Sequence, residues 1–252
     1  MIDLSGRVVF VSGSASGIGC ATATLFAKSG ANLVIHGLDQ AEELLAVKDD
    51  LTQLGSKVLV SEGDLTDEDV VAQVVDQVRQ EFGCLDVLVN CVGASPMKNF
   101  LKDMPLDNWN RILAINLNTQ MLMCRGFLPL LERGKSKSII NISSSVSRVG
   151  GVPGGIGYTT AKGGVESFTR ALARELAPLK IRVNAVSPGL VESAFHPFSA
   201  KKHYASIIDF IPLGRVGEPA DIAGPILFLA SNLADWVTGE TIEVTGGMRL
   251  SF

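Results

Sequence analysis

The stretch Ser12–Gly19, SGSASGIG, follows directly on the apolar run Val8–Val11 and contains three of the chain's 26 glycines. A β-branched run, a glycine-rich turn and a segment of helical period are typical of the first strand, turn and helix of a parallel α/β sheet. Glycine is needed where φ is positive or where a Cβ would keep a ligand away. Backbone N–H groups at the start of such a helix bind phosphate. The spacing is G-x-x-x-G-x-G rather than the dinucleotide pattern G-x-G-x-x-G, so this stretch alone also fits an ordinary tight turn.

The same alternation of short apolar runs with longer segments of helical period continues along the chain. We expect strands at 8–12, 32–36, 57–61, 87–91, 138–142, 182–186 and 241–244. We expect helices near 17–29, 40–54, 67–82, 107–132, 157–177 and 218–231, with Asp67 and Asp107 as N-caps. This pattern predicts a Rossmann-type α/β fold: one doubly wound, parallel, seven-stranded sheet with helices on both faces. No repeat or linker marks a second domain, so we expect a single domain over residues 1–252.

Composition narrows the class of partner. With 22 Lys and Arg against 26 Asp and Glu, the net charge is −4, and no basic field is available for nucleic acid. No apolar run approaches the roughly 18 residues that span a bilayer, and no secretory signal is visible at the start. The four cysteines have no metal-ligand spacing. We therefore expect a cytoplasmic protein that binds neither nucleic acid, membrane nor metal.

Residues 189–217 interrupt the alternation, because this long segment contains no clear strand and mixes aromatic, His and Lys residues. Long connections without regular structure in a compact domain are typical of lids and binding loops. We predict a substrate lid here; a surface excursion with a small core of its own is the alternative.

Tyr158 and Lys162, in GYTTAK, are four residues apart in a segment of helical period and so share one helix face. A phenol titrates near pH 10, and a nearby ammonium favours the phenolate by about one to three pKa units. The pair can therefore form a working general acid/base. An exposed Tyr above an exposed Lys is the alternative for this pair taken alone.

Taken in order along the chain, these two motifs and five others resemble the classical short-chain dehydrogenase/reductase family. SGSASGIG is similar to the family's T-G-x-x-x-G-x-G, and Asn90–Gly93 (NCVG) to its N-N-A-G. INLN around Asn116, NISSS before YTTAK, VNAVSPG at 183–189 and TGETIEVTGG near the end complete the set. The resemblance covers essentially the whole chain.

The resemblance implies a catalytic role for Asn116, Ser144, Tyr158 and Lys162. Tyr158 would exchange a proton with the substrate oxygen, Lys162 would lower the pKa of Tyr158 and hold the nicotinamide ribose, and Asn116 would hold a relay water. Counting forward from the strand points to Ser144 as the serine that binds the substrate oxygen, whereas counting back from Tyr158 points to Ser145. We prefer Ser144, because a glycine-rich loop absorbs an extra residue more easily than a strand does.

The resemblance also implies a nicotinamide cofactor, and charge near the adenosine 2′ position decides which one. The usual acidic and basic positions are Gly37 and Leu38, so neither signal is present. The neutral turn and the nearby Asp39 favour NAD; NADP is the less favoured alternative, through a protonated His36. Asp64 resembles the family's adenine-binding position, with a helix cap as the alternative. The expected cofactor-binding residues are Gly13, Ser14, Ser16, Gly17, Ile18, Gly19, Leu38, Asp39, Asp64, Leu65, Asn90, Val92, Gly93, Tyr158, Lys162, Pro188, Gly189 and Val191.

The substrate wall reads as mainly apolar, which suits a secondary alcohol or a ketone with hydrocarbon bulk. The expected substrate-binding residues are Ser144, Ser145, Val146, Tyr158, Leu190 and Phe195. The sequence thus predicts an NAD-dependent alcohol dehydrogenase or ketone reductase, with homotetrameric assembly implied by the resemblance. A nucleotide-binding sensor or scaffold without turnover, and a C=C reductase on the same fold, remain the alternatives.

Overall fold

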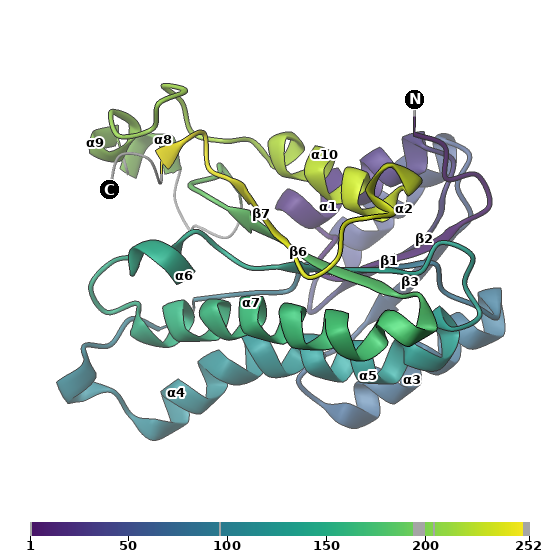
Figure 1. Cartoon of the computed structure of the whole chain (residues 1–252), viewed down its shortest axis with the longest axis horizontal. Helices are drawn as coiled ribbons and strands as arrows, with labels where there is room; N and C mark the ends of the chain where they lie inside the picture. Colours follow the sequence, from purple (N-terminus) through teal and green to yellow (C-terminus); the bar gives the residue numbers. More distant parts are fainter. Residues whose placement is uncertain (1, 96, 194–199, 204, 249–252) are drawn as a thin grey trace.

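The computed structural model describes residues 2–95, 97–193, 200–203 and 205–248, which build one parallel sheet of seven strands in the order β3-β2-β1-β4-β5-β6-β7 (Figure 1). The strands are β1 (Val8–Val11), β2 (Asn32–Gly37), β3 (Val58–Glu62), β4 (Val87–Asn90), β5 (Ser138–Ile142), β6 (Arg182–Pro188) and β7 (Thr241–Val244). Each predicted strand is present to within two residues at either end, and the predicted Rossmann-type fold is confirmed.

Helices cover both faces of the sheet, with α1, α2 and α10 on one side and α3, α5 and α7 on the other (Figure 1). The longer helices are α1 (Gly17–Lys28), α2 (Ala41–Gln53), α3 (Glu68–Phe82), α4 (Leu106–Leu113), α5 (Thr119–Leu131), α7 (Ile156–Leu176) and α10 (Pro219–Ala230). The short ones are α6 (Val146–Val149), α8 (Ala200–His203) and α9 (Ala205–Ile208), with 3-10 turns at Leu101–Asp103, Ala177–Leu179 and Asn232–Ala234.

Alternation along the central strands divides the core into two layers. Val9 and Val11 of β1 pack in the cluster that includes the buried residues of α1, α2 and α10. Val8 and Phe10 point the other way, into the cluster with α3 and α5. Because successive side chains of a strand face opposite sides, the apolar run that follows Arg7 supplies both layers, as a sheet buried on both faces requires.

Several local expectations need correction. Asp67 caps α3 as predicted, accepting from the Asp69 N–H at 2.8 Å. Asp107 was expected as an N-cap, but Pro105 occupies that position and the helix begins one residue before Asp107. The helix expected over 107–132 is divided by a π-helical turn at Ala114–Asn118.

The segment expected to lack regular structure contains two short helices, α8 and α9, in its described part. An isolated parallel bridge between Val191 and Gly217 closes its base. Helix α6 was also not expected, because its four residues are too few to establish a helical period.

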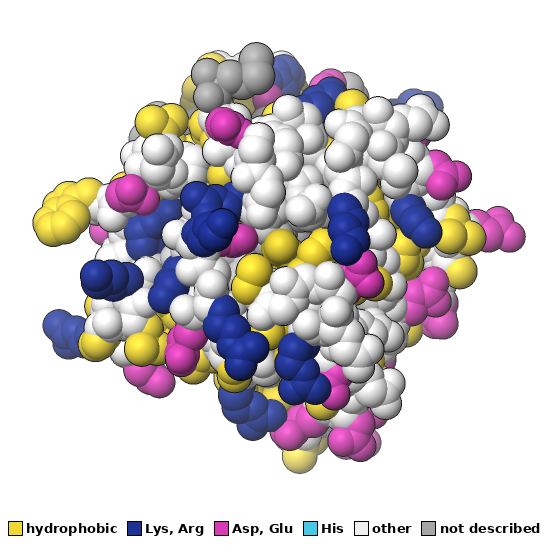
Figure 2. All heavy atoms as spheres, turned by 90° about the vertical axis from the view of Figure 1, so that its right-hand side faces the viewer, with side chains coloured by type: hydrophobic (Ala, Val, Ile, Leu, Met, Phe, Trp, Pro, Cys, Tyr) yellow, Lys and Arg dark blue, Asp and Glu magenta, His cyan; other side chains and the backbone are white. Residues whose placement is uncertain are grey.

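The strand order reverses between β1 and β4, the position at which ligands bind beyond the carboxyl ends of an open α/β sheet. The opposite end of the sheet carries Lys and Arg interspersed with Asp and Glu on the face drawn in Figure 2. In the part of the chain that the structure describes, no helix has the length and apolar character needed to cross a bilayer.

Candidate active site

A cavity of about 880 Å³ extends across the carboxyl ends of the strands, from the glycine-rich turn to helix α7. This volume lies in the upper part of the range for small-molecule sites. The lining includes most of the predicted cofactor and substrate residues: Gly13, Ser16, Gly17, Ile18, Gly19, Leu38, Asp64, Leu65, Val92, Gly93, Ser144, Ser145, Val146, Tyr158, Lys162, Pro188, Gly189, Leu190 and Val191. The fold therefore brings these residues together, although they are spread over 179 positions of sequence.

The glycine-rich turn has the conformation and space that its sequence suggested. Gly13 and Gly17 have φ of +64° and +56°, in the region that favours glycine. A Cβ on Gly19 would overlap the carbonyl oxygen of Gly13, so the turn closes only with glycine at that position. At the start of α1, Ser16 makes no side-chain capping bond and the first turn has no acidic residue. The backbone N–H groups of the first turn of α1 therefore have no side-chain acceptor from these residues, and they suit a diphosphate.

Two of the expected cofactor residues, Ser14 and Asn90, are absent from the lining because their side chains hold the sheet together. The Ser14 hydroxyl accepts from the His36 N–H at 2.8 Å, which ties the turn to β2. The Asn90 amide donates to Asn141 Oδ1 at 2.9 Å within the sheet. Asp39 is also outside the lining, and its φ is +54°. Phe195 lies outside the described residues.

Asn116 is fully buried in the π-helical turn and supports the cavity wall from behind. Its amide accepts from the Ala94 N–H at 3.1 Å and donates to the Ala94 carbonyl at 2.7 Å. A Cβ on Gly93 would lie 3.0 Å from Lys162 Nζ and 3.1 Å from Asn116 Oδ1. Glycine at position 93 thus leaves the space in which the amide and the ammonium approach each other.

Burial dominates the electrostatics of the Tyr158 and Lys162 pair. Lys162 Nζ lies 5.6 Å from the centroid of the Tyr158 ring and donates to the Ile142 carbonyl at 2.8 Å. Burial raises the pKa of Tyr158 to about 12, against a lowering by its hydrogen bond with Ser144. Burial also lowers the pKa of Lys162 to about 8. The net lowering of the Tyr158 pKa that the sequence suggested is therefore not found, because removing the phenolate from water costs more than its neighbours return.

Of the two candidate serines, Ser144 has the side chain that contacts the phenol. Its hydrogen bond with Tyr158 is the influence that lowers the pKa of that group. Ser145 is tied by its backbone N–H to the Pro188 carbonyl at 2.9 Å. The side chains of both residues line the cavity, but the contact with Tyr158 favours Ser144.

The far end of the cavity, beside β2 and β3, contains residues that sequence reasoning missed. Arg111 of α4 donates to Asp64 Oδ2 and to Thr66 Oγ1, each at 3.0 Å, and all three line the cavity. The contacts join positions 47 and 45 residues apart, so no local motif signals them. Lys98, in the loop after β4, lines a different part of the cavity, beside Gly154 of the loop before α7, and was also not expected there.

His36 lines the same end of the cavity, and its environment keeps it uncharged. Its Nε2 lies 3.0 Å from the Gly63 carbonyl oxygen, so this nitrogen carries the proton of the neutral ring. Burial lowers the pKa of His36 to about 4. The protonated His36 that would attract a phosphate is therefore disfavoured at neutral pH.

The residues present fit a dinucleotide with a nicotinamide end. Gly19 lets the turn close on itself, Gly93 leaves room beside Lys162, and the α1 N-terminus offers N–H donors without a side-chain cap. Such a cofactor supplies a hydride when it is bound. Among the described residues, no group of three His, Cys, Asp or Glu side chains gathers as metal ligands.

Comparison with known proteins agrees with this geometry. A family model described as enoyl-(acyl carrier protein) reductase matches residues 13–249. The 3-oxoacyl-(acyl-carrier-protein) reductase of Thermotoga maritima is 38% identical over 245 residues, covering 97% of this chain and 98% of the relative. That of Aquifex aeolicus is 35% identical over 247 residues, covering 98% and 99%.

A solved structure gives the same result. The crystal structure of a protein described as a short-chain alcohol dehydrogenase from Sinorhizobium meliloti 1021 superposes with a TM-score of 0.92. The two chains are 30% identical and each is covered over 99% of its length. The chain belongs to the short-chain dehydrogenase/reductase family of oxidoreductases.

Proposed function

We propose that the protein is an NAD(H)-dependent oxidoreductase that interconverts a secondary alcohol and a ketone, with Tyr158 as the general acid/base. The observation that supports this most is the hydrogen bond between Ser144 and Tyr158 at the wall of the cavity that also contains the glycine-rich turn. A hydroxyl pair next to a cofactor cavity can bind one substrate oxygen from two sides.

The proposed steps use this chain's own groups. In reduction, Tyr158 donates its proton to the carbonyl oxygen while Ser144 donates a hydrogen bond to the same atom. Lys162 would hold the nicotinamide ribose and return a proton to Tyr158 through a relay water beside Asn116, whose own amide is bonded to Ala94 and Ile112. Because the pKa of Tyr158 is about 12, the phenol is protonated at neutral pH and ready to act as an acid.

The preference for NAD has one structural basis. Among the described residues that line the cavity beside β2, no positively charged side chain is free to pair with the 2′-phosphate of NADP. His36, Gly37, Leu38 and Gln40 line the cavity there, and His36 is neutral at pH 7. Arg111 is engaged by Asp64 at 3.0 Å. A 2′-phosphate at this end would therefore lie near the Asp64 carboxylate without a free cation to pair with it.

The substrate side of the proposed site is partly apolar where it is described. Val146, Leu190 and Ile207 line the cavity, and Ile207 belongs to the proposed lid at about 189–217. The relatives named above are 3-oxoacyl-(acyl-carrier-protein) reductases, so 3-oxoacyl thioesters belong in the substrate panel beside simple ketones.

A C=C reductase is the second candidate, because the matching family model is described as an enoyl-(acyl carrier protein) reductase. A sensor that binds the cofactor without turnover is the third, from a different functional class. We further propose a single domain, a cytoplasmic location and a homotetramer; exposed Leu106, Met121 and Ile156 on α4, α5 and α7 support an interface on that side. Light scattering of the purified protein tests the tetramer.

The experiment is a titration of the protein with NADH and NADPH by fluorescence, followed by absorbance assays at 340 nm with ketones, 3-oxoacyl thioesters and an enone. We expect tighter binding of NADH and its consumption with at least one ketone. Tighter binding of NADPH would overturn the cofactor preference. Formation of a saturated ketone from the enone, without reduction of any carbonyl group, would favour the C=C reductase. Binding of NADH or NADPH without turnover of any substrate in the panel would favour the sensor.

A further inference from the structure

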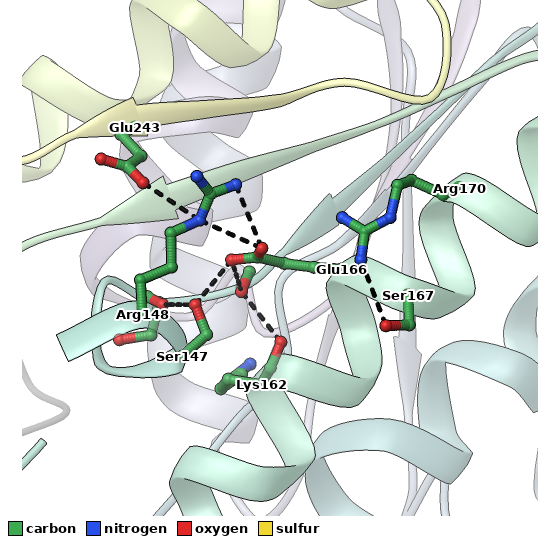
Figure 3. Close-up of polar contacts among 9 residues, drawn as sticks. Ser147, Arg148, Lys162, Glu166, Ser167, Arg170 and Glu243 are labelled. Carbon is green, nitrogen blue, oxygen red and sulfur yellow. Dashed lines mark hydrogen bonds and ion pairs between the residues drawn. The ribbon is translucent and has the colours of Figure 1, made fainter. Parts of the chain in front are cut away.

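Glu166 of α7 is a buried carboxylate that none of the predicted roles uses. It lies one helical turn after Lys162, and its side chain is 7% exposed. Figure 3 shows it directed away from the helix toward the turn between β5 and α6. Its oxygens accept from Ser147 Oγ at 2.6 Å, Ser143 Oγ at 3.3 Å and Arg148 Nε at 3.2 Å. A buried carboxylate with this many partners is expected to fix the segment that provides them.

The segment that Glu166 contacts is the one that carries Ser144. Ser143 and Ser147 lie on either side of Ser144, and the Ser147 hydroxyl is also 2.7 Å from the Ser144 carbonyl oxygen. The Ser143 hydroxyl is 3.0 Å from the Lys162 carbonyl oxygen. Each hydroxyl thus lies between a backbone acceptor of the catalytic segments and the Glu166 carboxylate. Helix α7 thereby holds both its own Tyr158 and the turn that presents Ser144.

Arg148 joins this arrangement to the sheet. Its guanidinium contacts Glu166 Oε2 at 3.2 Å and Glu243 Oε1 of β7 at 3.1 Å (Figure 3). One cation therefore serves two carboxylates. If Glu166 becomes Gln, Arg148 keeps Glu243 as its partner, so the change leaves no buried unpaired cation, the usual cause of a severe loss of stability.

We propose that Glu166 is a positioning residue, which locks the Ser144 turn to helix α7 and so sets the hydrogen bond between Ser144 and Tyr158. Its catalytic consequence rests on the proposed function, whereas the geometry that it sets does not. Glu166 does not itself line the cavity, and its contacts are with Ser143, Ser147 and Arg148 rather than with the phenol, so it acts through the turn that carries Ser144.

The direction in which the pKa of Tyr158 moves when Glu166 is replaced distinguishes a positioning role from a purely electrostatic effect of its negative charge. The groups that influence the pKa of Tyr158 besides burial are Ser144, which lowers it, and Cys91, which raises it; Lys162 Nζ lies 5.6 Å from the ring centroid. Glu166 itself contacts Ser143, Ser147 and Arg148, and Arg148 also contacts Glu243. Loss of a negative charge alone would lower the pKa of Tyr158. Loss of a well-placed Ser144 hydrogen bond would raise it.

The experiment exploits the fact that the chain has only two tyrosines, Tyr158 and Tyr204. In a Tyr204→Phe background grown with 3-fluorotyrosine, a single fluorine resonance reports the titration of Tyr158 without any turnover. The ring fluorine also lowers the phenol pKa and brings the midpoint within reach. Glu166→Gln is compared with Glu175→Gln, an exposed carboxylate on the same helix.

We expect Glu166→Gln to move the fluorine midpoint upward and Glu175→Gln to leave it unchanged. In the native background, Glu166→Gln should lower kcat about tenfold with NADH affinity unchanged, a part of the usual general acid/base contribution. Ser147→Ala, which removes a contact of Glu166 without changing charge, should move the midpoint in the same direction and decides the matter if Glu166→Gln does not fold.

A downward or absent shift in these variants would overturn the proposal. A blank substrate panel together with the upward shift would contradict the proposed function and leave the positioning role of Glu166 intact. Normal kcat with the upward shift would show that the Ser144 contact does not limit the reaction, which contradicts the catalytic part of this inference.

Discussion

The side chain of Ser144 hydrogen-bonds Tyr158, and this contact lowers the pKa of a phenol that burial raises to about 12. The contact joins the turn after β5 to the start of α7, and α6 and a glycine-rich loop lie between the two residues in the sequence. It is the feature by which the two neighbouring serines, Ser144 and Ser145, differ.

Ser144→Ala should therefore reduce kcat more than Ser145→Ala. We expect a loss of about a hundredfold for Ser144→Ala, the lower end of the general acid/base scale, because both the substrate oxygen and Tyr158 lose a hydrogen bond. The Ser145 backbone bond to Pro188 is kept in Ser145→Ala, so its loss should be smaller. The check is kcat for both variants at saturating NADH; the opposite order would assign the role to Ser145.

Gly19→Ala should impair cofactor binding. Its Cβ would overlap the Gly13 carbonyl oxygen, so the turn must move away from the position that the diphosphate requires. We expect the NADH affinity to fall at least about tenfold, which corresponds to about 1.4 kcal/mol, together with some loss of thermal stability.

Gly224→Ala is the matched control for this change. Gly224 lies inside α10, and a Cβ there would meet no atom within 4 Å. Because Ala favours a helix by up to about 1 kcal/mol over Gly, this variant should bind NADH normally and unfold at an equal or higher temperature. Equal NADH affinity in both variants would show that the turn tolerates a side chain.

His36 should make the protein sensitive to acid. Its pKa is lowered by burial from 6.5 to about 4, so between these values the unfolded chain binds a proton that the folded chain does not. Stability is therefore lost as the pH falls from 6.5 to 4, by about 3 kcal/mol if the whole depression is expressed.

Urea unfolding of the native protein and of His36→Gln at several pH values tests this. Glutamine keeps a donor for the Gly63 carbonyl but does not titrate, so the variant should lose less stability over this interval than the native protein. The same dependence on pH in both proteins would mean that other groups cause the acid sensitivity.

The sequence predicted the sheet well because parallel strands buried on both faces are near-continuous apolar runs, as in Val87–Asn90 of β4. The sequence-based prediction failed where the local structure depends on only a few residues or on contacts between residues far apart in the sequence. The four residues of α6 are too few to show a period, and α4 begins at Leu106, with Pro105 rather than Asp107 at the N-cap position and without a side-chain capping bond.

The site shows the same division. The residues of the Gly-rich turn are close in sequence, and so are Tyr158 and Lys162. That the members of each group lie close together could therefore be predicted. Burial could not: the raised pKa of Tyr158 follows from how the whole fold encloses the phenol. The contact of Arg111 with Asp64, and that of Glu166 with Ser147, join elements whose distance is set only by tertiary packing.

The central claim is that Tyr158 transfers a proton to the substrate oxygen, and Tyr158→Phe tests it most directly. Phenylalanine keeps the ring beside Lys162 and removes only the hydroxyl. With the best ketone of the panel, kcat should fall at least about a hundredfold, while NADH affinity stays within a few-fold of the native value. A variant that binds NADH normally and reduces the ketone at the native rate would contradict the account.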